Sequence, residues 1–381
     1  MSEHSQVVDP FQSIRPYRDN EVAEVLGRML RDNEFVDVIT HYQFPRLPKW
    51  VLRILRPAVR IALAAKVGEI ETVSSFQTLI AGYMTKMISR TTSRLSCSGI
   101  DQLDPQEAYL FVSNHRDIAM DPAFVNWALY QYGMNTVRIA IGDNLLKKPY
   151  VSDLMRLNKS FIVRRSLKAP REMMASMTQL SEYIDHSIMT GHSVWIAQRE
   201  GRSKDGNDRT DPTLLKMFYM SHRKQRSFAE MVTRLNIVPV SISYEYDPCD
   251  AMKARELAAI EETGKYEKSQ YEDIDSIVKG ITGAKGHVHV SFGQPIRGIY
   301  ETPEQLAQEI DRQIRSDYYL HPSNLVAAGE SIDAKTEQAF AARLAQVSGR
   351  AEDFLRNMYA NPVYNRREAE SLTQNEADSH A

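Results

Sequence analysis

The sequence predicts an α/β fold in which a largely parallel sheet is flanked by helices. From residue 107 onward, short β-rich runs alternate with helix-like segments, and this alternation is typical of parallel sheets. The 381-residue chain is also 43% hydrophobic and 25% charged, which is ordinary for a globular protein with a substantial core. The predicted strands are residues 109–113 (YLFVS), 137–142 (VRIAIG), 160–163 (SFIV), 193–197 (SVWIA), 237–243 (IVPVSIS) and 287–292 (HVHVSF).

Helices are predicted before the first strand. Apolar residues recur at helical spacing over residues 19–40, and Asp19 or Asn20 opens this segment. Residues 49–67, KWVLRILRPAVRIALAAKV, have the same spacing, with a kink expected at Pro57. The cations of this segment form one stripe along the predicted helix: Lys49, Arg53, Arg56 and Arg60. The apolar residues lie largely on the opposite face: Val51, Leu52, Leu55, Val59 and Leu63. Residues 74–95 continue with a helix-like pattern.

Between and after the strands, the helix-like segments are residues 121–132, 143–157, 168–190 and 211–234, then 302–318 and 333–359. Residues 249–286 are charged and are predicted to form an inserted helical segment with a loop. The polar tail from about residue 365 is predicted to be disordered. The domains expected are therefore an N-terminal helical segment (1–95), an α/β domain (96–300), a C-terminal helical extension (301–364) and a tail (365–381).

Charge and composition narrow the classes of function. The net charge of −2 gives no reason to expect a nucleic-acid partner. Cys97 and Cys249 are isolated, so they predict neither a disulfide framework nor a metal site, and a reducing compartment is expected. No signal-peptide core and no apolar run of about 18 residues is present. We expect a cytoplasmic protein, or one that lies on a membrane surface without crossing it.

The stretch FVSNHRDIAMDPAFV, residues 111–125, is the first candidate site. It places His115 on a loop between a buried strand and a helix, at the edge of an α/β sheet where ligands bind. Histidine there can act as a general base if a carboxylate orients its ring, and Asp117 and Asp121 are both near enough. Asp121 is also the predicted N-cap of the helix, with Pro122 in its first turn. The alternative is that Asp121 only caps the helix and His115 is a surface residue.

Three further stretches follow strands or lie within one. NKSFIVRRSLKAP delivers Arg164 and Arg165 at a strand end, where paired guanidinium groups suit phosphate or carboxylate. WIAQREGRSKDG runs from a strand into a charged loop containing Glu200, Gly201 and Arg202, and its glycine permits close approach of a ligand. Both stretches are also compatible with solvated loops. In NIVPVSISYEY, the proline within an apolar strand indicates an edge or a bulge, or a wall of the site.

Taken in order, NHRDIAMD, NKSFIVR, AQREGRS and IVPVSI resemble the four blocks of the glycerolipid acyltransferase family, over roughly residues 95–300. The family blocks are Asn-His-x4-Asp, Gly-x-x-Phe-Ile-x-Arg, Phe-Pro-Glu-Gly-Thr-Arg-Ser and an apolar Val-Pro strand. This chain departs from them in three places. Five residues, not four, separate His115 from Asp121, Asn158 stands in place of the second block's glycine, and the third block lacks its threonine.

The resemblance implies an O-acyltransferase without a metal or other cofactor. His115 would deprotonate the hydroxyl of glycerol-3-phosphate or 1-acylglycerol-3-phosphate, and the alkoxide would attack the thioester of acyl-CoA or acyl-carrier protein without an acyl-enzyme. In this interpretation Asp121 or Asp117 orients His115, while the substrate-binding residues are Arg164, Arg165, Glu200, Gly201, Arg202 and Asn114. There are two alternatives. The acceptor could be another lysolipid or an aminoacyl lipid, or the chain could be a non-catalytic lipid-binding protein of the same fold.

A lipid substrate would also give the basic helix of residues 49–67 a role. A helix with cations on one stripe and an apolar face opposite can lie at an anionic leaflet, so the resemblance implies peripheral, monotopic association with the inner membrane. An ordinary core-packing helix with a solvated basic face is the alternative.

Overall fold

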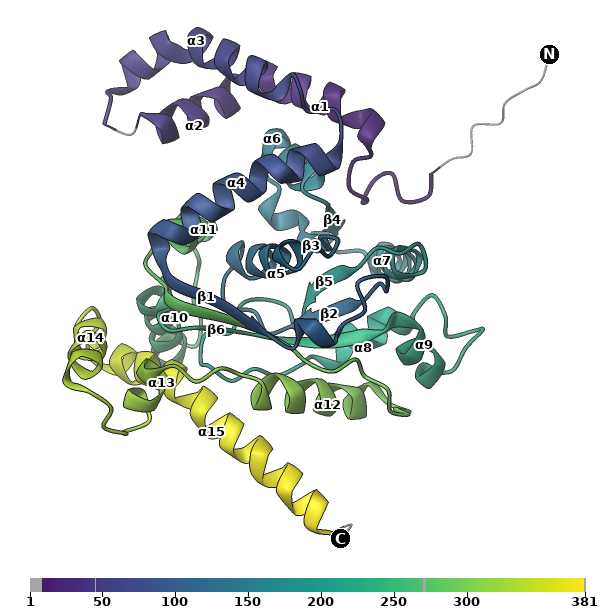
Figure 1. The fold of residues 1–381 in the computed structure, drawn as a ribbon, viewed down its shortest axis with the longest axis vertical. Helices are drawn as coiled ribbons and strands as arrows, with labels where there is room; N and C mark the ends of the chain where they lie inside the picture. Colours follow the sequence, from purple (N-terminus) through teal and green to yellow (C-terminus); the bar gives the residue numbers. More distant parts are fainter. Residues whose placement is uncertain (1–8, 45, 270–271, 380–381) are drawn as a thin grey trace. The chain divides into compact units, whose positions relative to one another are not determined.

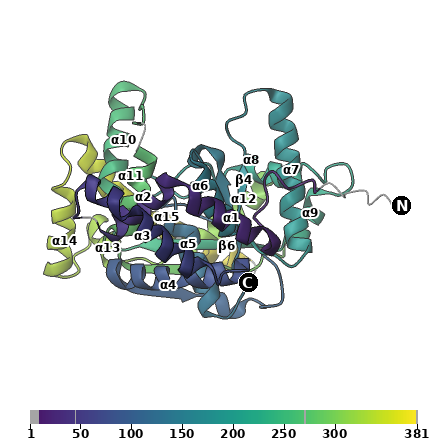
Figure 2. The ribbon, with the colours of Figure 1, turned by 90° about the horizontal axis from the view of Figure 1, so that it is seen from above.

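A computed structural model describes residues 9–44, 46–269 and 272–379, and the chain in it forms two units (Figures 1 and 2). The first unit comprises the described residues up to Tyr83 together with Arg138–Met173. The second comprises Met84–Val137 together with the described residues from Met174 onward. The units therefore do not follow the boundaries expected at residues 95, 300 and 364, because residues 138–173 associate with the N-terminal helices.

The second unit contains five neighbouring strands of a seven-stranded sheet, in the order β1-β7-β6-β2-β5. The pairs β1/β7, β6/β2 and β2/β5 are parallel, and only β7/β6 is antiparallel among these four. Figure 1 shows α5 on one face of this sheet and α12 on the other. The predicted α/β class with a largely parallel sheet is therefore confirmed. The strands are β1 (Thr92–Ser98), β2 (Leu110–Ser113), β5 (Val194–Ala197), β6 (Ile237–Tyr244) and β7 (Gly286–Phe292).

Helices connect and cover these strands. They are α5 (Met120–Gln131), α7 (Pro170–Met189), α8 (Pro212–Tyr219), α9 (Phe228–Leu235), α10 (Asp250–Thr263), α11 (Glu272–Thr282), α12 (Pro303–Ser316), α13 (Pro322–Ala327), α14 (Ala334–Leu344) and α15 (Arg350–Ser379). Local sequence explains several boundaries. Ser227 and Glu230 form a capping box that begins α9, and Asn236 ends it in the left-handed conformation, with φ of 49°, directly before β6.

Pro239 lies in β6, which is a central strand, so the prediction of an edge is wrong. Val112 of β2 is its register partner, but the carbonyl of Pro239 accepts from Gly293, on the β7 side of the strand. The β6/β7 ladder ends at the pair Val240 and Phe292, one residue short of Pro239. The missing N–H therefore lies at the end of the β6/β7 ladder, and the pairing of β6 with β2 continues past Pro239.

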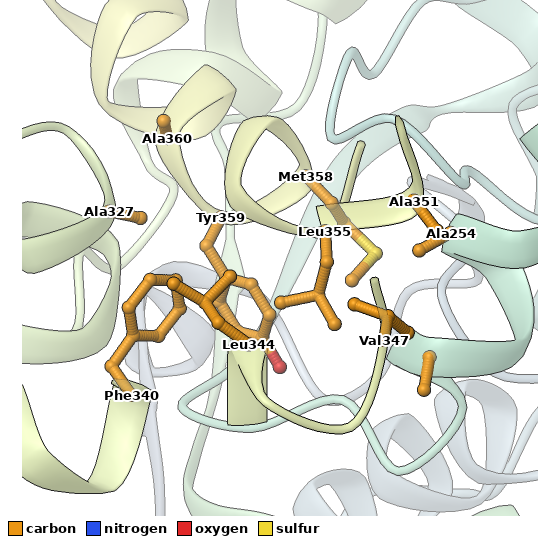
Figure 3. Packing of buried hydrophobic residues seen from close by; sticks show 11 residues of the cluster. Ala254, Ala327, Phe340, Leu344, Val347, Ala351, Leu355, Met358, Tyr359 and Ala360 are labelled. Atoms are coloured by element: carbon orange, nitrogen blue, oxygen red, sulfur yellow. The ribbon is translucent and has the colours of Figure 1, made fainter. Parts of the chain in front are cut away.

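The C-terminal segment is part of the second unit's core. Side chains from α10, α13, α14 and α15 form one buried cluster, in which the rings of Phe340 and Tyr359 meet edge to face at 5.4 Å beside Leu344 and Leu355 (Figure 3). The helix α15 continues well past residue 365, where disorder was predicted. Arg366 donates to the Tyr318 carbonyl and Ala369 is buried, so packing holds a segment whose composition alone is polar.

The first unit contains α1 (Asp19–Arg31), α2 (Asn33–Gln43), α3 (Lys49–Val67), the first part of α4 (Val73–Thr91), α6 (Pro149–Leu157) and the parallel pair β3 (Arg138–Gly142) and β4 (Ser160–Val163). The single helix predicted over residues 19–40 is two helices, because Asp32 caps a new one by accepting the N–H groups of Glu34 and Phe35. The helix predicted over 74–95 ends at Thr91, and β1 begins directly after it.

Helix α3 spans the predicted residues, but its faces differ from the predicted ones. Leu52 is buried, and the other residues of the predicted apolar face are half-buried within the unit. A second apolar stripe points outward, with Trp50 66%, Ile54 67% and Ile61 71% exposed. Of the cations, Arg56 pairs with Asp37 at 2.6 Å and Arg60 donates to Asn33 at 2.7 Å. Within the described residues, no helix is long and apolar enough to cross a membrane.

Candidate active site

His115 and Asp121 lie together where β2, β5 and β6 end. The Nδ1 atom of His115 is 2.9 Å from Oδ2 of Asp121, and the side chains are 14% and 0% exposed. Because a carboxylate only accepts hydrogen bonds, this contact selects the tautomer with hydrogen on Nδ1 and leaves Nε2 to accept a proton. The Trp195 ring of β5 packs edge to face on His115, with ring centroids 5.8 Å apart.

Asp121 accepts three further hydrogen bonds. Its Oδ2 atom receives the backbone N–H groups of Arg116 at 2.6 Å and Asp117 at 2.9 Å. Its Oδ1 atom receives the Tyr244 hydroxyl at 2.7 Å. The predicted role of Asp121 as N-cap is wrong, because α5 begins at Met120 and Asp121 is already within its first turn. The carboxylate instead faces back over the loop that carries His115.

Asp117, the other candidate partner of His115, has a different set of contacts. Its Oδ1 atom accepts the N–H groups of Ala119 and Met120, at 2.9 and 2.8 Å, and so holds the start of α5. A β-carbon on Gly280 of α11 would overlap this carboxylate, so a glycine is needed there. Burial, together with the charge of nearby Asp121, raises the pKa of Asp117 to about 6.

Asn114 serves the fold rather than a substrate, which corrects the sequence-based assignment. It is fully buried, its Oδ1 accepts the Ile242 N–H at 2.8 Å, and its Nδ2 donates to the Ile242 carbonyl and to Asp208. Asp208 also forms a buried ion pair with Arg116 at 2.6 Å. The sequence could not show these contacts, because both partners lie more than 90 residues away along the chain.

The third motif lies beside the first one. The Gln198 N–H donates to the Ser113 carbonyl at 2.7 Å, and the Ser203 N–H donates to the His115 carbonyl at 2.6 Å. The loop between these bonds carries Glu200 and Gly201, which are both exposed. Gly201 has φ of 76°, and open space surrounds the position that a β-carbon would take. A ligand next to His115 can therefore approach this loop closely.

The three predicted arginines are placed differently. Arg202 is only 9% exposed and its guanidinium points to the hydroxyl of Ser276, at 3.4 Å. It is therefore poorly placed for the acceptor phosphate that the sequence assigned to it. Arg164 and Arg165 directly follow β4 and are exposed. They belong to the first unit, so their relation to His115 stays a prediction.

Tyr244 is the site residue that the sequence analysis missed. It is the last residue of β6, and its ring meets Phe124 of α5 edge to face at 5.9 Å. Burial, followed by the charges of Asp121 and Asp117, raises the pKa of its hydroxyl well above the usual value. The signal available in the sequence is its place at the carboxyl end of an apolar strand, which is the same edge that carries His115.

This chain resembles a family and several known relatives, and the family matches the part of the sequence that contains this site. The family model described as Acyltransferase matches residues 94–244. The glycerol-3-phosphate acyltransferase of Pseudomonas syringae pv. tomato is 26% identical over 224 residues, which is 58% of this chain and 25% of that protein. The same enzyme of Xanthomonas axonopodis pv. citri is 28% identical over 203 residues, which is 52% of this chain and 21% of that protein. The matches thus span only about a quarter of the length of these relatives.

Among solved structures, the crystal structure of the 1-acyl-sn-glycerophosphate (LPA) acyltransferase PlsC from Thermotoga maritima aligns with 78% of this chain and 95% of that one. The sequence identity is 12% and the TM-score 0.37, so no conclusion is based on this likeness. The matched residues 94–244 contain the His115–Asp121 pair, the loop with Glu200 and Gly201, and Tyr244. Over these residues, the chain is similar to the acyltransferase family.

Proposed function

We propose that this chain transfers a fatty acyl group from acyl-CoA or acyl-carrier protein to the hydroxyl of glycerol-3-phosphate or 1-acylglycerol-3-phosphate. The observation that carries the proposal is the His115–Asp121 contact of 2.9 Å at the carboxyl end of β2. It leaves Nε2 as a base next to the open Glu200–Gly201 loop. The curated relatives, which are named glycerol-3-phosphate acyltransferases, support the choice of acceptor.

The proposed reaction needs no acyl-enzyme. Nε2 of His115 takes the proton of the acceptor hydroxyl as the oxygen attacks the thioester carbonyl, and Asp121 stabilises the imidazolium that forms. The tetrahedral intermediate then expels the thiolate, which takes the proton back from Nε2. The base contributes about 10²–10⁴-fold, and positioning of the two substrates supplies most of the remainder.

In the proposed complex Glu200 and Gly201 border the acceptor, while Arg164 and Arg165 bind its phosphate. The support for the arginines is their exposure at the end of β4 and the fit of a guanidinium fork to phosphate. Arg164→Ala should raise the KM for the acceptor much more than the KM for the donor, and Arg164→Lys should rescue only part of the loss. Equal changes in both KM values would contradict this role.

The test of the function is acyl transfer from labelled acyl-CoA and acyl-carrier protein to a panel of acceptors. The panel contains glycerol-3-phosphate, 1-acylglycerol-3-phosphate, a lysophospholipid and an aminoacyl lipid. Wild type should acylate one of the first two, and His115→Ala should lose at least about 100-fold in kcat with an unchanged Tm. The control is His186→Ala, which removes an exposed histidine from α7. Full activity of His115→Ala, transfer only to another acceptor, or lipid binding without turnover would each overturn the proposal.

The proposal includes docking at a membrane surface, since the acylated product is a lipid. Trp50, Ile54 and Ile61 of α3 present an outward apolar stripe, and Arg53 is exposed on the same helix. Replacing these three apolar residues with serine should weaken binding to vesicles of phosphatidylglycerol and phosphatidylethanolamine by at least roughly ten-fold. Ile299→Ser, which removes an apolar side chain that is 84% exposed elsewhere, is the control. Unchanged co-sedimentation of the triple variant would contradict docking through α3.

A further inference from the structure

Tyr244 is part of the hydrogen-bond chain that begins at His115. Its hydroxyl donates to Oδ1 of Asp121, at 2.7 Å, while the other oxygen of the carboxylate faces His115 and two backbone N–H groups. Each oxygen therefore has its own donors. Rotation of the carboxylate would take Oδ1 away from Tyr244 and Oδ2 away from His115 together.

The position of Tyr244 is fixed independently of Asp121. Two residues earlier, the Asn114 side chain holds both the N–H and the carbonyl of Ile242, at 2.8 and 3.0 Å. The ring of Tyr244 packs against Phe124 and is only 4% exposed. Since the surrounding carboxylates and burial raise the pKa of this phenol well above its usual value, the hydroxyl keeps its proton. It can then act as a permanent donor to Asp121.

We propose that Tyr244 is a positioning residue for the acyl transfer, which holds the Asp121 carboxylate so that one oxygen always faces Nδ1 of His115. The inference rests on the proposed function of His115 as the base. Tyr244 is buried and contacts the carboxylate rather than a substrate, so its removal should change the chemical step and not substrate binding. The hydrogen bond from Tyr244 also draws electron density from the Asp121 carboxylate. It therefore weakens the attraction between that carboxylate and a protonated imidazole.

The first test is the kinetics of Tyr244→Phe. We expect kcat to fall by roughly 10- to 100-fold with nearly unchanged KM values, because the base is misoriented. The control is Tyr109→Phe at the opposite end of β2, whose hydroxyl bonds the backbone of Asp104. A lower Tm with unchanged kcat would show a merely structural role and overturn the proposal.

The second test does not need activity. Nitrogen-15 NMR of the histidine rings, with His115 assigned by comparison with His115→Ala, should show one tautomer with hydrogen on Nδ1 in wild type. In Tyr244→Phe it should show a mixture of the two tautomers. If His115→Ala is active, the proposed function fails, and the NMR result still decides whether Tyr244 positions the ring. An unchanged tautomer in Tyr244→Phe would overturn the inference alone.

A third variant covers the case in which Tyr244→Phe does not fold. Placing 3,5-difluorotyrosine at position 244 keeps the shape and strengthens the phenol as a donor. The single tautomer of His115 with hydrogen on Nδ1 should then persist with nearly wild-type kcat, because the donor to Asp121 remains. A mixture of tautomers or a large loss of kcat in this variant would contradict the proposed role.

Discussion

At the scale of single residues, the two aspartates of the first motif have separate tasks. Asp121 contacts the His115 ring, whereas Asp117 accepts the N–H groups at the start of α5. Asp121 also ties the loop together through the Arg116 and Asp117 N–H groups, so the loop and the ring share one carboxylate. This division allows the two residues to be distinguished by one isosteric change in each.

We expect Asp121→Asn to lower kcat by about 10³–10⁴-fold while the melting temperature changes little, because a neutral amide cannot stabilise the imidazolium. Asp117→Asn should retain most of the activity, since an amide oxygen can still accept from Ala119 and Met120. Steady-state kinetics and thermal melts of both variants are the measurement. An inactive Asp117→Asn beside an active Asp121→Asn would reverse the assignment and make Asp117 the partner of His115.

At the scale of elements, β7 and the residue before α13 carry a cluster of histidines that the proposed function does not use. The Ser96 hydroxyl lies 2.7 Å from both Nε2 of His287 and Nδ1 of His289. His321 packs edge to face on His287 with ring centroids 5.0 Å apart, and Tyr319 stacks beside all three rings. Burial, together with the neighbouring histidines, lowers the pKa of His289 to about 4 and that of His321 to about 3.

This cluster should make the protein less stable in acid. Between pH 4 and an unfolded-state pKa of about 6.5, the unfolded chain binds protons at His289 and His321 that the folded chain does not. Stability is therefore present above pH 6.5 and falls as the pH drops, by about 1.4 kcal/mol per pH unit for each histidine. Arg94 near the cluster acts in the same direction on His289, whereas Glu245 beside His287 opposes it.

Asp117 has the opposite effect on how stability depends on pH. Its folded pKa of about 6 exceeds the unfolded value of about 3.9, so its contribution favours folding as the pH falls from 6 to 4. The contribution of one carboxyl group cannot offset the contributions of two histidines. The free energy of unfolding should therefore decrease as the pH is lowered from 6.5 to 5. Urea unfolding at pH 5, 6 and 7 measures this, and the double variant His289→Gln with His321→Gln should flatten the dependence. His186→Gln is the exposed control, and an unchanged slope in the double variant would refute the assignment.

How far the sequence predicts the elements depends on whether their signal is local. The strand Ser160–Val163 and the helix Lys49–Val67 match their predictions residue for residue, because an apolar run and a helical stripe are local patterns. β1 was missed since TSRLSCS is mostly polar and becomes a strand only through its pairing with β7. The roles of Asn114 and Tyr244 were out of reach for the same reason, because both depend on partners over 120 residues away.

At the scale of the whole molecule, the C-terminal helix is connected to the loop that carries His115, within the second unit. Tyr359 of α15 accepts the Asp247 N–H at 2.9 Å, and Asp247 forms an ion pair with Lys253 at 2.5 Å. Lys253, which is almost fully buried, then donates to the carbonyl of Arg116 at 2.6 Å. The expected C-terminal extension is thus part of the structure that holds the residue next to His115.

We therefore expect a core substitution in α15 to destabilise the protein. Leu355 is fully buried in the C-terminal cluster, so Leu355→Ala should lower the free energy of unfolding by about 2–5 kcal/mol. Tyr364→Ala, on the same helix but 51% exposed, should stay within about 0.5 kcal/mol of wild type. Urea unfolding monitored by circular dichroism is the measurement. Equal stability of the two variants would mean that α15 is an independent appendage.

The backbone bond from Ser203 to the His115 carbonyl joins the two loops whose lengths differ from the family pattern. The loop with His115 has one residue more than the pattern, and the loop with Glu200 has one residue fewer. We expect the two changes to compensate each other, because an added residue in one loop moves the loop to which it is hydrogen-bonded. Relatives with five residues between the histidine and the aspartate should also lack the threonine, and an enzyme given only one of the two changes should lose activity that the second change restores.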